Sequence, residues 1–196
     1  MKIAITGTTS GIGCALVHEL EHNNEIWQIN RPEYDLLDDR ALHSIDLTGY
    51  DVLINNAGAD YKREEFISQK YKHWQNTVKI NLLVPMYLTQ KFIQQNTKGI
   101  VINLTSTGAI KLPTTDSTVF YRSSKIALKH FTREINDIHE KFRIVDIEPG
   151  KTETKFTENA GSEKGLSRAR LQPTHIVNAV KYAINSPYVT DIRVKC

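Results

Sequence analysis

The sequence predicts an α/β protein with a doubly wound sheet of about seven parallel strands and helices on both faces. Three observations predict this class. Short runs rich in isoleucine and valine alternate with longer segments of helical periodicity, as in stacked β-α-β units. A glycine-rich turn joins the first strand to the first helix. The length of 196 residues suits one core, so we expect residues 1–196 to form a single dinucleotide-binding and catalytic domain.

The expected elements follow from the hydrophobic pattern along the chain. Strands are expected at 2–6, 25–30, 51–55, 99–105, 143–147 and 189–194, with a very short one at 34–36. Helices are expected at 11–23, 39–45, 73–96, 119–141 and 174–185. The polar segment 155–172 breaks this pattern. It is either a lid over the substrate or an ordinary surface connection, and the sequence leaves both open.

Composition excludes several classes of function. The net charge of +3 is small and evenly spread, so we expect no nucleic-acid partner. No apolar stretch reaches the length of a membrane span or of a signal-peptide core, which favours a cytoplasmic protein with no membrane partner. The two cysteines build no disulfide framework, and the seven histidines lack zinc-binding spacing, so no metal is expected.

The turn after the first strand has the spacing of a phosphate-binding loop. Gly7 permits a tight turn, Gly11 allows a phosphate to approach the backbone, and Gly13 allows the helix to pack against the strand. With Ser10 and Ile12, these residues open a helix whose free N–H groups and dipole favour a pyrophosphate. The glycines also fit a purely structural turn and cap, and the motif alone does not decide between the two.

Six motifs together resemble the short-chain dehydrogenase/reductase family and occur in that family's order. They are Thr-Gly-x-x-x-Gly-Ile-Gly at 6–13, Asn55-Asn56-Ala57-Gly58, Asn81, Asn103-Leu104-Thr105-Ser106, Tyr121-Arg122-Ser123-Ser124-Lys125 and Pro149-Gly150-Lys151-Thr152-Glu153-Thr154. The resemblance runs from residue 2 to about 194. It implies a Rossmann-type oxidoreductase that interconverts a carbonyl and an alcohol with NAD or NADP.

The chemistry of the site can also be argued from the residues. Tyr121 and Lys125 are four residues apart, so on a helix their side chains share one face. A neighbouring ammonium favours the phenolate and lowers the high pKa of a tyrosine, which makes Tyr121 a candidate general acid/base. Ser106 follows the carboxyl end of a strand, where its hydroxyl can orient a substrate oxygen.

The resemblance assigns further roles. It implies that Lys125 also holds the nicotinamide ribose and that Asn81 anchors a water linking the lysine to solvent. It places the cofactor against further residues, namely Asn55, Ala57, Gly58, Pro149, Gly150, Thr152 and Thr154. The asparagines of 55–58 can also bridge backbone groups at the edge of the sheet, and this structural role is compatible with contact to the cofactor. Family members commonly pair through the helices expected here at 73–96 and 119–141, so a homodimer or homotetramer is expected.

The end of the second strand indicates the cofactor. No carboxylate stands there to bind a ribose hydroxyl, and Arg31 suits the 2'-phosphate of NADP(H), which we favour over NAD(H). Pro32 can instead turn Arg31 towards solvent. Asp35 and Leu36 resemble the family's pair that lines the adenine pocket. They follow Arg31 so closely that the usual helix between the second and third strands is expected to be lost.

Two other functions compete with a carbonyl reductase. A non-catalytic dinucleotide-binding redox sensor would share the fold, but the complete set of Ser106, Tyr121, Lys125 and Asn81 argues against it. Sugar-nucleotide epimerisation or dehydration would need an additional substrate domain, for which the chain is too short. The substrate is expected to be a small carbonyl or alcohol. The basic residues of 155–172 favour an acidic substrate no more than they favour a solvated surface.

Overall fold

The computed structural model describes residues 1–62, 64–109, 118–154 and 170–195. Its centre is a sheet of six parallel strands in the order β2-β1-β3-β4-β5-β6. The strands are β1 (Lys2–Thr6), β2 (Glu25–Ile29), β3 (Val52–Asn55), β4 (Gly99–Leu104), β5 (Phe142–Pro149) and β6 (Asp191–Val194). The strand order reverses between β1 and β3, and ligands of open α/β sheets bind outside the carboxyl ends at such a reversal.

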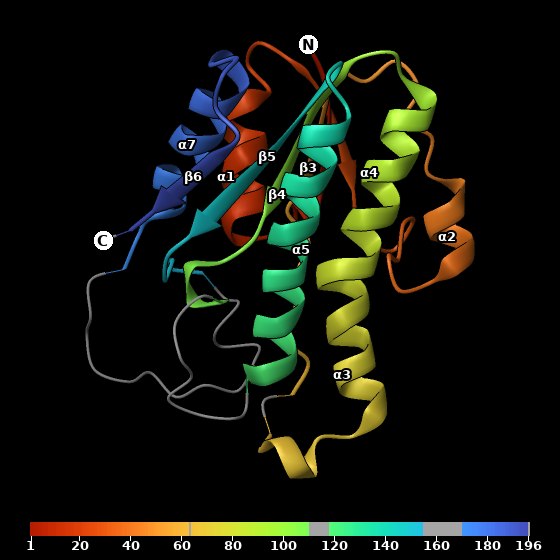
Figure 1. Cartoon of the computed structure of the whole chain (residues 1–196), viewed down its shortest axis with the longest axis vertical. Helices are drawn as coiled ribbons and strands as arrows, with labels where there is room; N and C mark the ends of the chain where they lie inside the picture. The colour runs from red at the N-terminus through yellow and green to blue at the C-terminus, as the bar shows by residue number, and fades with distance from the viewer. Residues whose placement is uncertain (63, 110–117, 155–169, 196) are drawn as a thin grey trace.

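Helices cover both faces of the sheet (Figure 1). They are α1 (Gly11–Leu20), α2 (Asp39–Ser44), α3 (Tyr71–Val78), α4 (Val84–Gln95), α5 (Val119–Ile138) and α7 (Pro173–Asn185), with short turns η1 (Phe66–Ser68) and η3 (Thr107–Ala109) and a π-helical segment η2 (Lys79–Leu83). None of the helices within the described ranges is both long enough and apolar enough to cross a membrane.

Two hydrophobic cores lie on opposite faces of the sheet. Ile3 and Ile5 of β1 pack with α1 and α7, whereas Ala4 between them packs with residues of α2 and α4. This alternation is the pleat of a strand buried on both sides. It explains why the strands are continuous apolar runs in the sequence, and it confirms the predicted α/β class.

The prediction of about seven strands is wrong, because the described part of the chain holds six strands and 34–36 is not one of them. Local turns occupy the backbone there: Tyr34 N–H donates to the Asn30 carbonyl, and Asp38 N–H donates to the Asp35 carbonyl. The Asp35 carboxylate also accepts from Leu37 N–H. No helix lies in the described chain between β2 and Asp35, as expected, and the helix expected at 39–45 is present as α2, which leads on to β3.

The single helix expected at 73–96 is divided into α3, the π segment η2 and α4. Val84 N–H donates to the Lys79 carbonyl five residues earlier, which is the π pattern. Pro85 explains the change in winding. It has no N–H, so an α-helical bond from residue 85 to the carbonyl of Asn81 cannot form.

Candidate functional site

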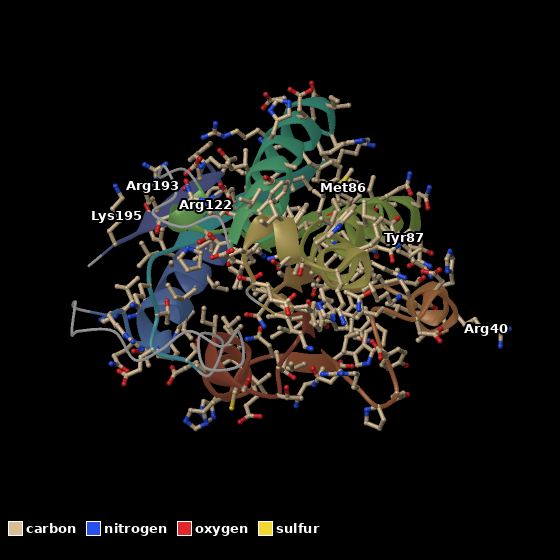
Figure 2. All side chains as sticks on the ribbon, turned by 90° about the horizontal axis from the view of Figure 1, so that it is seen from below. Arg40, Met86, Tyr87, Arg122, Arg193 and Lys195 are labelled. Carbon is tan, nitrogen blue, oxygen red and sulfur yellow. The ribbon has the colours of Figure 1, made fainter. Side chains whose placement is uncertain are left out.

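Most of the predicted site residues gather where the parallel strands end. Gly7 follows β1, Ala57 and Gly58 follow β3, Ser106 follows β4, and Pro149 closes β5. Figure 2 views this edge of the molecule from below, with Arg40 of α2 on one side and Arg193 of β6 on the other. The strand reversal between β1 and β3 lies at this edge. It is therefore the candidate site.

The glycine-rich loop has a shape that side chains would destroy. Gly7 and Gly11 have φ angles of 69° and 58°, in the left-handed region that favours glycine. A Cβ on Gly13 would lie 2.2 Å from the Gly7 carbonyl oxygen, so the predicted close packing of α1 against the strand is confirmed. Ser10 is the N-cap residue before α1 and makes no side-chain capping bond. Its hydroxyl and the first N–H groups of α1 suit the pyrophosphate of a dinucleotide.

Asn56 holds this loop in place, although it is not among the residues expected to contact the cofactor. Its amide nitrogen donates to the carbonyls of Thr6 and Gly7, at 2.9 and 2.7 Å. The Thr6 hydroxyl in turn accepts from the N–H groups of Asn56 and Ala57. The bridging of backbone groups expected of the asparagines is thus confirmed for Asn56.

The side chain of Asn55 points into the protein rather than to the ligand edge. Its amide donates to Asn103 Oδ1 at 2.8 Å and to the Thr89 hydroxyl at 3.4 Å. Successive residues of a strand face opposite sides, so Asn55 and Asn56 cannot both reach the loop. This alternation was the signal that distinguishes them. Any contact of Asn55 with a cofactor would have to come from its backbone.

Asn81 lies at the middle of the π segment with no exposed surface. Its amide donates to the carbonyls of Ala59 (2.5 Å) and Thr77 (2.8 Å), and its Oδ1 accepts from Ala59 N–H (3.3 Å). The side chain thus holds the chain beyond Gly58 against α3. A Cβ on Gly58 would lie 2.8 Å from Asn81 Oδ1 and 3.5 Å from Lys125 Nζ, which places Asn81 and Lys125 around one small space.

Lys125 is a buried cation on the sheet-facing side of α5. Its side chain donates to the Leu104 carbonyl at 2.8 Å, and the residue is 5% exposed. Burial lowers the pKa of Lys125 from its ordinary value to about 8, and Asp146 opposes this shift. Tyr121 is half-buried one helical turn before it. The predicted juxtaposition on one helix is confirmed, because α5 runs unbroken through both residues.

Ser106 is two residues beyond the carbonyl that Lys125 binds. Its Oγ accepts a hydrogen bond from Gly108 N–H at 3.2 Å, at the start of η3. An acceptor role of this kind leaves the hydroxyl proton able to donate to another oxygen. Ser106 and Lys125 are thereby joined through the end of β4, with Tyr121 on the neighbouring helical turn.

The segment after β5 closes the other side of the edge. Gly150 N–H donates to the Val194 carbonyl at 2.8 Å, which ties this segment to β6. Thr152 is turned inwards, donating to the Gly150 carbonyl at 2.9 Å. Thr154 lies beside the phosphate-binding loop, because a Cβ on Gly11 would be 3.0 Å from its methyl group. Of the two threonines expected to contact the cofactor, Thr154 therefore lies next to the phosphate-binding loop, whereas the side chain of Thr152 binds the Gly150 carbonyl.

The residues expected around the adenosine differ in their surroundings. Arg31 is exposed directly after β2, whereas Leu36 is 6% exposed and belongs to the core on the α2 side. Burial raises the pKa of the nearby Tyr61 hydroxyl, while Arg31 lowers it and Asp35 raises it further, so these three polar groups are neighbours. Asn30 is bound to Thr8 of the glycine-rich loop through both ends of its amide. Tyr61 was missed by the sequence analysis.

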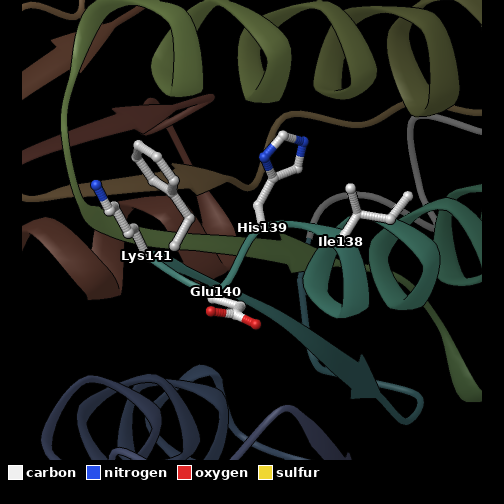
Figure 3. Close-up of a pocket in the computed structure, with 5 residues that line it drawn as sticks. Ile138, His139, Glu140 and Lys141 are labelled. Atoms are coloured by element: carbon white, nitrogen blue, oxygen red, sulfur yellow. The ribbon is translucent and has the colours of Figure 1, made fainter.

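Of the expected lid at 155–172, residues 155–169 lie outside the described part of the chain. Leu171 pairs with Thr152 in an isolated β-bridge. A separate pocket of about 300 Å³ is lined by five residues of the α5–β5 turn, Ile138, His139, Glu140, Lys141 and Phe142 (Figure 3). Phe142 begins β5, so this pocket is at the amino-terminal edge of the sheet and is not the candidate site.

Known proteins resemble this chain in sequence. A family model of short chain dehydrogenases matches residues 39–165, more than half of the chain. The short chain dehydrogenase helC of Aspergillus fumigatus is 28% identical over 67% of this chain, and the chain spans 58% of that protein's length. Serine 3-dehydrogenase of Rhizobium radiobacter is 30% identical over 79% of this chain and 73% of its own length.

Solved structures share the fold. A mutant 4-hydroxyisoleucine dehydrogenase complexed with NADH and succinate has a TM-score of 0.87 at 23% identity, covering 99% of this chain and 96% of that one. A short-chain dehydrogenase from Sphingobium yanoikuyae in complex with NADPH has a TM-score of 0.83 at 18% identity, covering 97% and 87%. With the family match and the motifs at the carboxyl edge of the sheet, these findings show that the chain belongs to the short-chain dehydrogenase family.

Proposed function

We propose that this protein interconverts a small-molecule carbonyl and its alcohol by hydride transfer with a nicotinamide dinucleotide, with Tyr121 as the general acid/base. The observation that carries the proposal is the buried ammonium of Lys125 one helical turn from Tyr121. A lysine buried beside a phenol stabilises the phenolate and lowers the energy of releasing its proton. The relatives in the family bear names of dehydrogenases, which supports the same class of reaction.

In the direction of reduction, Ser106 donates its hydroxyl proton in a hydrogen bond to the carbonyl oxygen. A nicotinamide dinucleotide bound at the glycine-rich loop would supply the hydride for the carbonyl carbon. As negative charge develops on the oxygen, Tyr121 transfers its phenolic proton to it, giving the alcohol and a phenolate. Lys125 stabilises that phenolate, and with a pKa of about 8 it is largely protonated at neutral pH.

Asn81 is proposed to supply the acceptor for a water that returns the proton to Lys125. The side chain of Asn81 is engaged with the backbone of Ala59 and Thr77, so the backbone carbonyl of Asn81 is the group available for this role. Pro85 removes the N–H that an α-helix would direct at that carbonyl. The π segment supports the proposal, since single π turns in helices are frequent at functional sites.

For the cofactor we propose NADP(H) in preference to NAD(H). Arg31 is exposed at the end of β2, and the neighbouring Asn30 is held by Thr8, which leaves the guanidinium as the cationic group at this point. A guanidinium binds a phosphate with two parallel hydrogen bonds. Structures with a similar fold contain NADPH in one case and NADH in another, so the preference depends on this chain's own residues.

The proposal is tested with Tyr121→Phe. The variant keeps the ring and Lys125, so its affinity for NADPH should equal that of the wild type. Turnover of a panel of aldehydes and ketones should fall by roughly a hundredfold or more, the usual contribution of general acid catalysis. Titration followed by NADPH fluorescence measures the affinity, and steady-state kinetics measure the turnover. Wild-type turnover in the variant would refute Tyr121 as the proton donor.

A further inference from the structure

A cluster of charges with a buried centre lies behind the candidate site. It contains three cations and three anions from α5, β5 and β6, namely Lys129, Arg133, Asp146, Glu148, Asp191 and Arg193. Asp146 and Glu148 have no exposed surface. Lys129 Nζ lies 3.0 Å from Asp146 Oδ2 and 3.2 Å from Asp191 Oδ2, and it also contacts Glu148. Because residues 129 and 191 are far apart in the sequence, no local motif predicts this cluster.

The cluster is not explained as a metal site. Oxygens of Asp146, Glu148 and Asp191 lie within 4.8 Å of one another, which by itself would suit a cation. The ammonium of Lys129 already lies among them. Burial lowers the pKa of Lys129, but its hydrogen bonds with Glu148 and Asp146 outweigh this effect and raise the pKa, so Lys129 stays protonated among the three carboxylates.

Stability alone does not account for the cluster either. Removing a carboxylate and an ammonium from water costs several kcal/mol per ion, and apolar side chains of similar volume are often as stabilising. What such a cluster does provide is a fixed geometry, because each charge must keep its partners. Lys129 therefore helps to fix the carboxylate of Asp146 through its Oδ2.

Asp146 connects the cluster to the end of β4. The Thr105 hydroxyl donates to Asp146 Oδ1 at 2.5 Å, and Thr105 N–H donates to the Ile147 carbonyl at 2.9 Å. Thr105 stands between Leu104, whose carbonyl accepts from Lys125, and Ser106. Lys125 thus holds Leu104, and Asp146 holds Thr105. The next residue, Ser106, carries the hydroxyl proposed to orient the substrate.

The contacts close a ring on one helix. From Lys125 on α5 the path runs to the Leu104 carbonyl, through Thr105 to Asp146, and from Asp146 to Lys129, one turn farther along α5. Figure 1 shows α5 lying along β4 and β5. Lys125 therefore fixes Leu104 directly, and Lys129 fixes Thr105 through Asp146. Both residues stand just before Ser106, so these contacts set the position of Ser106 relative to Tyr121.

We propose that Thr105, Asp146 and Lys129 form an ionic tether that positions Ser106 and Lys125 for proton transfer. These three are positioning residues, since they act through Ser106 and Lys125. The tether rests on the proposed function, because it matters for turnover only if Ser106, Tyr121 and Lys125 perform the reaction. A misplacement of about 1 Å in a catalytic group can lower a rate by about a hundredfold.

The test removes one hydroxyl from the tether. Lys129→Met would leave the buried carboxylate of Asp146 without its cation and could prevent folding, so Thr105→Val, which keeps the shape, is the main variant. Its kcat should fall roughly tenfold or more while the Kd for NADPH is unchanged. Thr105→Ser restores the hydroxyl and should restore kcat. Amide hydrogen exchange at 105–109 of the cofactor-free protein should be faster in Thr105→Val than in the wild type.

Thr132→Val is the matched control. Thr132 is 1% exposed on α5 and bonds Asn103 and the Leu128 carbonyl, outside the tether. Thr132→Val should lose about as much thermal stability as Thr105→Val but keep the wild-type kcat. A second variant, Asp146→Asn, removes the charge and should also lower kcat. Wild-type kcat in folded Thr105→Val or Asp146→Asn, or an equal loss in Thr132→Val, would overturn the tether.

Tyr121→Phe separates the two proposals. If it retains full turnover, the proposed reaction itself is wrong. If Tyr121→Phe loses turnover while Thr105→Val keeps it, the reaction stands and only the tether is refuted.

Discussion

Lys125 illustrates how one buried side chain decides the chemistry of this site. Its ammonium donates to the Leu104 carbonyl, and burial lowers its pKa to about 8. A solvated lysine would have its charge screened by water and would stabilise a phenolate less. The spacing of Tyr121 and Lys125 can be predicted from the sequence. The burial of Lys125, which keeps water from screening its charge, depends on the packing of α5 against β4.

The reading of Arg31 as the phosphate-binding residue is tested by Arg31→Ala. The Kd for NADPH should rise about tenfold, the effect of losing a charged hydrogen bond, while the Kd for NADH should not change. Isothermal titration with both cofactors measures the difference. Arg40→Ala is the control, because Arg40 is an exposed arginine that points away from the molecule on α2 (Figure 2). An unchanged affinity for NADPH in Arg31→Ala would contradict the role of Arg31.

Neighbouring residues also show what sequence reasoning could not settle. Asn55 and Asn56 belong to one motif, yet Asn56 holds the glycine-rich loop and Asn55 bonds Asn103 in the interior. Strand alternation separates their directions but does not say which side faces the loop. Lys129 and Asp146 were invisible as partners, since a sequence shows charges but not which distant charges meet.

At the scale of elements, α3, η2 and α4 behave as one helix with a change of winding in the middle. The hydrophobic period continues through all three, which is why the sequence predicted a single helix at 73–96. The π segment follows from Pro85, whose missing N–H leaves the carbonyl of Asn81 without its α-helical donor. The proline was the available signal, and it stands beside the residue proposed to relay a proton.

Pro85→Ala tests this role of the π segment. The new N–H of residue 85 can bond the Asn81 carbonyl, so the segment should regain α-helical winding and the proposed water should lose its acceptor. We expect kcat to fall roughly tenfold, at the low end of the range for a lost proton-transfer step, with NADPH binding retained. Stopped-flow and steady-state kinetics measure the effect.

Pro173→Ala is the matched control for that experiment, since Pro173 also opens a helix, α7, on the other face of the sheet. It should leave kcat at the wild-type value. If Pro85→Ala has wild-type kcat, the carbonyl of Asn81 has no part in the reaction.

Most strands and helices were predictable at the level of elements because their apolar periods are strong. The very short strand expected at 34–36 is absent from the described chain, and its prediction was weak because three residues carry almost no periodic signal. Turn bonds from Tyr34 and Asp38 and the carboxylate of Asp35 decide that region. Local hydrogen bonds of this kind compete with sheet pairing and are not visible in a hydrophobic pattern.

For the whole molecule, the order of the strands explains why the site lies where it does. Parallel strands bring the ends of β1, β3, β4 and β5 to one edge, so residues from position 7 to position 154 meet there. The α/β class and this edge follow from the sequence. The precise order of the strands and the ion cluster between α5, β5 and β6 follow only from packing in three dimensions.

The central claim, hydride transfer assisted by Tyr121, is tested most directly by following the hydride itself. NADPH carrying deuterium at the transferring position of the nicotinamide is incubated with the protein and a panel of aldehydes and ketones, and the products are analysed by mass spectrometry. The proposed mechanism predicts alcohols carrying one deuterium on the former carbonyl carbon with the wild type, and a loss of most of this product with Tyr121→Phe. Binding of NADPH without transfer to any member of a broad panel would refute hydride transfer and favour a dinucleotide sensor.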